Sequence, residues 1–271
     1  MNECEVEVVK EVAKKAAEFG KEIALDLAKP SAKSIGENLG LMFDGLLGWI
    51  GCWGEKQKIK HQIDVEDFKN KTMAKILAIP QENLIEPKMY IVGPVLEATK
   101  YTYEEEYFRD MFSNLLAAAC DKNSAKHVHP SFIEVIKQLS PIDAKLINLF
   151  KDVNVYPMCD IQEIVSEKKI IPFRYSLFDF KEKKNIFSME EYMELTFSLN
   201  NLDRLGLLFK NRDILYADYD YSNFKNDELY KIYEKAKENS KDKLNIIRAR
   251  LELTEFGRMF RDCCIIEKIK S

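Results

Sequence analysis

Glycine, proline and histidine are all scarce in this chain. Its 271 residues include 10 glycines, 8 prolines and 3 histidines. A low glycine content disfavours a fold built from many tight hairpins and therefore favours a helix-rich one. A low histidine content narrows the choice of catalytic bases and metal ligands. The composition points to a mostly helical protein without an evident catalytic centre.

The chain also lacks an excess of positive charge. Lysine and arginine number 41 against 45 aspartates and glutamates, which gives a formal net charge of -4. This balance excludes a strongly basic coat for nucleic acid or anionic lipid. A hydrophobic share of 46% is that of a globular chain rather than a disordered one. The length of 271 residues fits one large domain or two of about 150 residues.

A secretion signal and a cysteine framework are absent as well. The first residues, MNECEVEVVKEVAKK, have no basic start followed by an apolar run and a cleavage site. The six cysteines show no CxxC spacing, so we expect reduced thiols in a cytoplasmic protein. The adjacent Cys263 and Cys264 could form a redox pair, although ordinary residues near a helix end are the simpler interpretation.

Motifs of catalysis are missing from the sequence. It contains no GxGxxG, GxxxxGK[ST], HExxH or GxSxG. His127 and His129 could begin a metal site, but no third ligand is recognisable nearby. The acidic run Glu104 to Glu106 is typical of a solvated helix N-terminus. We therefore expect no enzyme, no metal, no cofactor and no small-molecule substrate.

Helical periodicity dominates the first part of the chain, residues 1–125. Apolar side chains recur at three- and four-residue steps in the segments 5–28, 55–77 and 103–120. A proline-interrupted apolar stretch through Pro94 lies between the second and the third of these. This pattern predicts an N-terminal helical region.

The segment 31–54 is a glycine-rich amphipathic helix in this interpretation. It contains six of the ten glycines and both tryptophans, and its apolar face is formed by Leu39, Phe43, Leu46, Trp49, Ile50 and Trp53. Each helical glycine costs about 1 kcal/mol, so a compensating gain is expected. That gain could come from close helix packing, from self-association or from contact with a bilayer interface. Its polar face carries glycine and Asp44 rather than lysines, which favours packing or assembly over the membrane.

Residues 126–271 mix helices with strands. Short helices are expected at 131–139 and after the N-cap Ser140, and another at 161–166. A strand is expected at 169–180, a helix capped by Ser188 at 188–208, and a helix at 224–238. The alternating segment 244–253 predicts a half-buried strand, after which Thr254 caps a last helix.

Several of these segments resemble a winged-helix module. They are SPIDAKLINLF, NLDRLGLLFK, ARLEL and LTEFGRMF, within residues 140–265. The resemblance implies a leucine-rich helix that ends at glycine, then a β-hairpin wing, then a Leu-Thr-x-x-Gly start to a helix. The expected fold is therefore mainly α, with a helical region at 1–125 followed by an α+β winged-helix-like region at 126–271.

A winged helix raises the question of DNA binding. The candidate wing contacts are Arg204, Lys210, Arg212, Arg248 and Arg250. Phosphate contacts need cations, yet the helix that would enter the groove is rich in acids, namely Glu190, Glu191, Glu194 and Asp203. A protein-contact or structural role fits these charges better, and a nucleic-acid partner is not expected.

Patches spread over residues 79–260 also resemble the Abi-alpha family of bacterial abortive phage infection proteins. They are IPQENLIEP, YEEEYFRDMFSNLLAAA, HPSFIEVIKQLSPIDAKLI, NLDRLGLL and LTEFGRMF. The resemblance implies phage defence and no catalytic residues. We expect a non-enzymatic cytoplasmic defence protein that acts through a protein partner or through homo-oligomers. If segment 31–54 contacts lipid, the protein would be peripheral at the inner membrane. The alternative functions are a DNA-binding regulator and a purely structural interaction protein.

Overall fold

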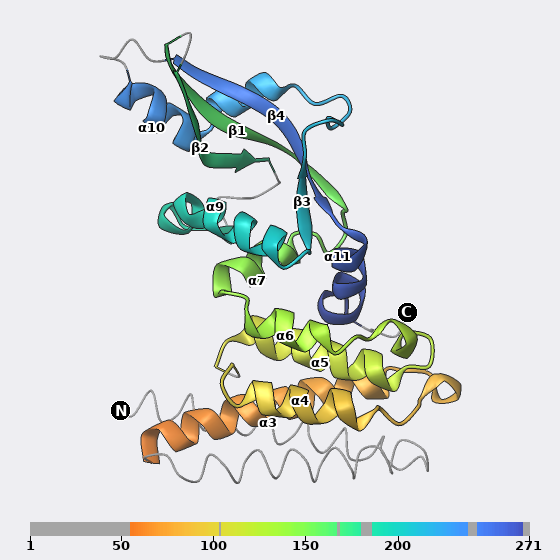
Figure 1. The fold of residues 1–271 in the computed structure, drawn as a ribbon. Helices are drawn as coiled ribbons and strands as arrows, with labels where there is room; N and C mark the ends of the chain where they lie inside the picture. The colour runs from red at the N-terminus through yellow and green to blue at the C-terminus, as the bar shows by residue number, and fades with distance from the viewer. Residues whose placement is uncertain (1–54, 103, 167–168, 180–185, 238–242, 268–271) are drawn as a thin grey trace. The chain divides into compact units, whose positions relative to one another are not determined.

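The computed structural model describes residues 55–267 except 103, 167–168, 180–185 and 238–242 (Figure 1). The helix expected at 5–28 and the glycine-rich helix 31–54 therefore lie outside the described residues. The chain divides into two compact units. Unit 1 holds the described residues of Met1–Gln138 and Asp262–Ser271, and unit 2 is Leu139–Arg261. The sequence analysis places its division near residue 125.

Unit 1 is a helical assembly. Its elements are α3 (Glu55–Leu77), η1 (Gln81–Asn83), α4 (Met89–Thr99), α5 (Glu106–Cys120), η2 (Ala125–His127) and α6 (Ser131–Lys137). Helix α5 packs against α3, α4 and α6. The largest side chains that this packing buries completely include Phe68, Phe112, Leu115 and Phe132. The helices expected at 55–77 and 103–120 are confirmed, the second beginning at Glu106.

Helix α4 runs through Pro94, where the sequence analysis expects only an interrupted apolar stretch. A proline inside a helix removes one backbone hydrogen bond and costs about 3 kcal/mol. Helix α4 buries Ile91, Val92, Val95 and Leu96 against the rest of unit 1. Burial of four aliphatic side chains contributes more than the proline costs, at about 1.5–3 kcal/mol each.

Unit 2 is built on a four-stranded antiparallel sheet with the order β2-β1-β4-β3. Its elements are α7 (Pro141–Asn148), β1 (Val155–Ser166), β2 (Lys169–Phe178), α9 (Met189–Arg204), β3 (Leu208–Asn211), η3 (Tyr221–Asn226), α10 (Glu228–Ala236), β4 (Lys243–Leu253) and α11 (Glu255–Phe260). A π-helical turn, η4 (Arg261–Ile265), follows α11. Helix α9 packs on β2 and β3, and η3 packs on β1 (Figure 1). The core of unit 2 includes Phe178, Leu199 and Leu251.

The helix expected at 161–166 is wrong, because these residues form the end of β1. Strand β1 is central, and it pairs with β2 on one side and with β4 on the other. The apolar Ile161, Ile164 and Val165 suit a helix turn and a strand alike, so the pairing partners decide. The helix expected at 188–208 ends at Arg204, and that at 224–238 divides into η3 and α10 because Asp227 caps a new helix.

Most local signals in unit 2 are confirmed. Ser140 and Ser188 each form a capping box, with Asp143 and Glu191 respectively. The strand expected at 244–253 is β4, whose buried residues are Ala249, Leu251 and Leu253. These features are predictable because capping and strand alternation depend on neighbours in the sequence.

Two of the segments that carry the family resemblance meet in the fold. Gly206 has a φ of 72° and ends α9, a conformation that favours glycine. The Thr254 hydroxyl donates to the Gly206 carbonyl and accepts from the Gly257 amide, which caps α11. A Cβ on Gly257 would lie 2.0 Å from the Leu207 carbonyl oxygen. Gly206 is therefore required by its positive φ, and Gly257 by the close approach of α11 to the α9–β3 turn.

The coarse expectation of a mainly helical protein with a small β part is confirmed. Elements α9, β3, β4 and α11 follow one another as expected for a winged helix. Between β3 and β4, however, lie η3 and α10 where a wing has a short turn. Assignment to the winged-helix class stays a prediction.

Candidate functional site

Helix α9 presents an apolar stripe to solvent. Met189, Met193 and Phe197 lie four residues apart, so they share one side of the helix. All three are exposed, and Phe197 is 77% exposed. A second stripe, Leu195, Leu199 and Leu202, faces the core instead. We call the exposed set the α9 stripe; Glu190 and Glu194 lie exposed in the same two turns.

Two of the five candidate wing contacts bind a buried carboxylate. Arg212 lies 2.5 Å from Asp160 Oδ2, and Lys210 Nζ lies 3.9 Å from Asp160 Oδ1. The Asp160 side chain is 1% exposed. Burial lowers the pKa of Lys210, and the neighbouring Asp160 opposes that shift. These two cations neutralise a carboxylate of β1, which the sequence analysis does not single out.

The other three candidate contacts have partners of their own. Arg250 Nε lies 2.6 Å from Glu252 Oε1, and Arg204 donates to Asn201 at 2.8 Å. The Arg248 guanidinium lies 6.0 Å from the centre of the Tyr221 ring, in cation–π contact. The structure therefore brings only Lys210 and Arg212 together on one group.

Ser176 joins the Asp160 cluster. Its hydroxyl donates to Asp160 Oδ1 at 2.6 Å and accepts from Lys210 Nζ at 3.0 Å. A serine beside a lysine of lowered pKa is an arrangement found in nucleophilic catalysis. Here the serine proton points to the aspartate, and Ser176 is 5% exposed. The cluster joins polar side chains of β1, β2 and β3 within unit 2. This arrangement favours a structural role.

A cavity of about 540 Å³ opens in unit 2 beside the start of α9. Its volume lies within the range of ligand sites, about 300–1,000 Å³. The wall combines aromatic and acidic residues with a few neutral polar ones and one lysine. The lining residues are Asp179, Phe187, Ser188, Met189, Tyr192, Tyr219, Asn223, Phe224, Asn226, Asp227, Glu228 and Lys231. Met189 belongs both to this wall and to the α9 stripe.

Two tyrosine–aspartate pairs form part of the cavity wall. The Tyr219 hydroxyl donates to Asp179 Oδ2 at 2.6 Å, and the Tyr192 hydroxyl donates to Asp227 Oδ2 at 2.8 Å. Burial and the adjacent aspartate raise the pKa of both phenols. Both phenols therefore keep their protons at neutral pH, and both protons are directed at carboxylates. We call this feature the tyrosine–aspartate cavity.

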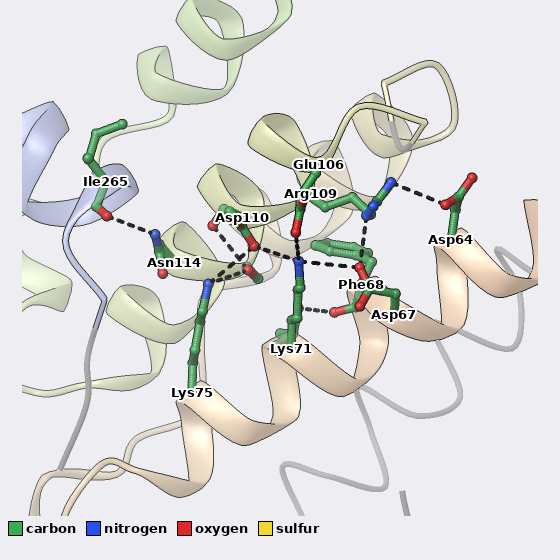
Figure 2. Close-up of polar contacts among 12 residues, drawn as sticks. Asp64, Asp67, Phe68, Lys71, Lys75, Glu106, Arg109, Asp110, Asn114 and Ile265 are labelled. Atoms are coloured by element: carbon green, nitrogen blue, oxygen red, sulfur yellow. Dashed lines mark hydrogen bonds and ion pairs between the residues drawn. The ribbon is translucent and has the colours of Figure 1, made fainter. Parts of the chain in front are cut away.

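Glu106, the last residue of the acidic run, belongs to a charge network between α3 and α5 (Figure 2). Lys71 Nζ lies 3.0 Å from Glu106 and 3.1 Å from Asp110. The hydrogen bond from Lys71 lowers the pKa of Glu106. Lys75 Nζ donates to Ser113 Oγ at 2.9 Å, and its pKa is lowered by burial against the pull of Asp110.

Arg109 is the most enclosed cation of this network. Its Nε lies 2.9 Å from Asp67 Oδ2, and one terminal nitrogen lies 3.3 Å from Asp64 Oδ1. The same guanidinium donates to the Glu104 carbonyl at 3.1 Å. We call Asp64, Asp67, Lys71, Lys75, Glu106, Arg109 and Asp110 the α3–α5 charge network. It joins two helices of unit 1, as Figure 2 shows.

The described cysteines are reduced thiols, and all are buried. They are Cys120, Cys159, Cys263 and Cys264. Burial raises the pKa of Cys120 to about 12 and that of Cys264 well above its usual range. Thiols that hold their protons are poor nucleophiles, so the geometry favours the ordinary-residue interpretation of Cys263 and Cys264 over a redox pair.

His129 serves local structure. His129 Nδ1 accepts from the Ser131 amide at 3.1 Å at the start of α6. Within residues 55–267, apart from the gaps given above, no three His, Cys, Asp or Glu side chains are grouped to hold a metal ion. In the same part of the chain, each helix is too short or too polar to cross a bilayer. The face Leu39, Phe43, Leu46, Trp49, Ile50 and Trp53 lies outside the described residues.

Comparison with known proteins shows the family of the chain. No curated protein and no solved structure matches the chain. The family model for abortive infection alpha matches residues 60–264, which is most of the chain. That range includes the α3–α5 charge network, the α9 stripe and the tyrosine–aspartate cavity. An abortive-infection-type role in phage defence is what this match suggests, and the chain belongs to the abortive infection alpha family.

Proposed function

We propose that the protein is a non-enzymatic component of abortive-infection phage defence that acts by binding a partner protein through α9. The observation that carries this proposal is the α9 stripe. Three large apolar side chains, Met189, Met193 and Phe197, face solvent on one side of a well-capped helix. Methionine and phenylalanine are enriched at protein interfaces, where they fill pockets of the partner.

The charge around the stripe argues for a protein partner over DNA. Glu190 and Glu194 flank the stripe and would repel phosphates. Lys210, Arg212 and Arg250 are engaged with Asp160 and Glu252. The alternative of a DNA-binding regulator would require salt-dependent duplex binding that weakens when Arg248 and Arg250 become alanine.

The same charges indicate the chemistry of the partner. An acidic helix with an apolar centre is complementary to a surface that is apolar in the middle and basic at its rim. We therefore expect a basic partner protein rather than a second copy of this chain, whose own α9 would bring further glutamates to the contact.

Phage challenge of a bacterial strain that expresses the protein tests the proposal. The wild type should lower the efficiency of plaquing of at least one phage in a panel, with death of the infected cells at high phage-to-cell ratio. Phe197→Glu should abolish that protection, because it places a charge at the centre of the stripe. Since Phe197 is 77% exposed, the variant should fold and accumulate normally.

Tyr90→Glu is the matched control. Tyr90 is 61% exposed on α4 of unit 1, so it loses a comparable aromatic ring outside the stripe. Protection that survives in Phe197→Glu would refute the role of α9. Equal loss in both variants, at wild-type protein levels, would refute it as well. Light scattering of the purified protein shows whether a second copy is the partner instead.

A second candidate function concerns the effector step and rests on residues 31–54. The apolar face of this segment carries both tryptophans of the chain, a residue type enriched at bilayer interfaces, although the lack of lysines on its polar face favours packing or assembly. Flotation of the purified protein with anionic and neutral liposomes tests this. Binding that is lost in a folded Trp49→Asp, Trp53→Asp variant would support a peripheral membrane effector. Absence of flotation for the wild type would remove constitutive membrane binding.

A further inference from the structure

The tyrosine–aspartate cavity has a chemical character that the contact proposal does not use. Three carboxylates line it, those of Asp179, Asp227 and Glu228, against the single ammonium of Lys231. Aromatic rings from Phe187, Tyr192, Tyr219 and Phe224 complete its walls. An acidic site with aromatic faces is complementary to an organic cation, which gains both charge attraction and cation–π contact.

The hydrogen bonds within the wall sharpen this complementarity. A neutral phenol has one proton, and those of Tyr192 and Tyr219 are both donated to aspartates. What these two pairs offer to a ligand is therefore acceptor lone pairs. A group that carries several N–H donors fits such a wall, whereas a phosphate or carboxylate ligand does not.

Two helix N-termini also border the cavity, and their positive ends would favour an anion if they were open. Both are capped within the chain. The Glu191 amide donates to Ser188 Oγ at 3.2 Å at the start of α9. The Leu229 amide donates to Asp227 Oδ1 at 3.0 Å at the start of α10. Acidic residues occupy the first turn of each helix, so the N-termini do not reverse the sign of the cavity.

The position of the cavity connects it to the α9 stripe. Met189 lines the cavity and is also the first residue of the stripe. A protein that covers Met193 and Phe197 and reaches Met189 would therefore contact the wall of the cavity. The volume of about 540 Å³ is ample for one long side chain.

We propose that the tyrosine–aspartate cavity receives an arginine side chain of the partner protein, as the anchor of the contact on α9. Arginine is favoured over lysine because its planar guanidinium stacks on tyrosine and phenylalanine rings and spreads five donors over separate acceptors. This inference rests on the proposed function, because it names the group by which the same partner is recognised.

Titration of the whole purified protein with Nα-acetyl-arginine methylamide tests the anchor without the partner. The tyrosine ring signals of the labelled protein, followed by NMR, should shift and saturate with a dissociation constant of about 1 mM or tighter. The citrulline analogue has nearly the same shape but no charge, and it should bind at least about tenfold more weakly.

Asp179→Asn is the decisive variant. Its side-chain oxygen still accepts from Tyr219, so the wall keeps its shape while it loses one charge. Affinity for the arginine probe should fall about tenfold, the size of effect expected for one charge-assisted hydrogen bond. Asp213→Asn, a control on an exposed loop outside the cavity, should bind as the wild type does.

Phe197→Glu separates this inference from the proposed function. Phe197 lies outside the cavity lining, so the variant should bind the arginine probe normally while it loses phage protection. Probe binding that is absent in the wild type, equal for citrulline or unchanged in Asp179→Asn would overturn the anchor and leave the α9 contact standing. Full phage protection by Asp179→Asn would overturn it too.

Discussion

The α3–α5 charge network of unit 1 and the tyrosine–aspartate cavity of unit 2 both contain several carboxylates, but the partners of these carboxylates differ. In the network, Asp64, Asp67, Glu106 and Asp110 meet lysine and arginine side chains of the facing helix. In the cavity, the phenol of Tyr219 donates to Asp179 and brings no positive charge. A carboxylate that meets a cation within the fold stabilises the fold. The Asp179 carboxylate accepts from a neutral phenol, so its negative charge remains to attract an incoming cation.

The largest expected difference between the two units is in how each tolerates alanine in place of a glycine. Gly257→Ala in unit 2 would place a Cβ 2.0 Å from the Leu207 carbonyl oxygen, so the α9–β3 turn and α11 must separate. We expect a loss of about 4 kcal/mol or more in the free energy of unfolding of unit 2. Gly93→Ala in unit 1 meets nothing within 4 Å and lies in α4, so it should be neutral or stabilise by up to about 1 kcal/mol.

Urea unfolding of both variants, followed by circular dichroism, measures the difference. Near-equal stabilities of the two alanine variants would show that the contact between the two family segments is loose. Loss of the unit 2 transition in Gly257→Ala alone would confirm that the segments NLDRLGLL and LTEFGRMF pack tightly on each other through Gly257.

The next largest loss of stability is expected for a substitution in the α3–α5 charge network. Arg109→Met removes the cation that lies between Asp64 and Asp67 and leaves both acids inside unit 1. Breaking a largely buried ion pair from one side costs about 3–5 kcal/mol, and the partial exposure of Asp67 places the expected loss near 3 kcal/mol. Lys137→Met, which breaks the exposed pair with Glu134, should change the free energy of unfolding by less than about 0.5 kcal/mol. A loss in Arg109→Met no larger than in this control would contradict the structural role of the network.

The same substitution in both regions tests the comparison directly. Asp67→Asn weakens contacts with Arg109 and Lys71 and should cost about 1–2 kcal/mol. Asp179→Asn keeps the hydrogen bond from Tyr219 and reduces the repulsion among the carboxylates of the cavity. Its free energy of unfolding should therefore stay within about 0.5 kcal/mol of the wild type. Thermal unfolding of the two variants side by side distinguishes these outcomes. A larger loss in Asp179→Asn would mean that this carboxylate serves the fold rather than a ligand.

How far the sequence predicts this molecule depends on how local each signal is. Helix α3, the capping boxes at Ser140 and Ser188 and the alternation of β4 follow from neighbouring residues, and they are confirmed. The end of β1 is not, because Ile161 to Ser166 suits a helix or a strand until pairing with β4 decides. Helix α4 is not predicted, because Pro94 normally ends a helix. The cost of Pro94 is offset by burial of the aliphatic side chains of α4, which the sequence does not reveal.

The candidate site was less predictable than the fold. Tyr192, Tyr219, Asp179 and Asp227 belong to four separate segments and to no motif, so only the fold brings them to one cavity. The α9 stripe could be read from its four-residue spacing, but the same helix carries Leu195, Leu199 and Leu202 as a second apolar stripe. Sequence alone does not show which of two apolar stripes faces solvent.

Acid titration of the network gives the smallest expected effect. The hydrogen bond from Lys71 lowers the pKa of Glu106 below its ordinary 4.5. A carboxyl group whose folded-state pKa is lowered contributes stability above its unfolded pKa and loses it as the pH falls through the folded value. At neutral pH, Glu106→Gln should therefore cost unit 1 less than about 1 kcal/mol, because Glu106 is largely exposed. Below the folded pKa the wild type and the variant should converge, whereas Glu82→Gln, outside the network, should differ from the wild type equally at each pH. Urea midpoints at pH 7 and at successively lower pH, until the Glu106 carboxyl is protonated, measure this, and a gap that persists in acid would show that Glu106 acts through packing rather than through its charge.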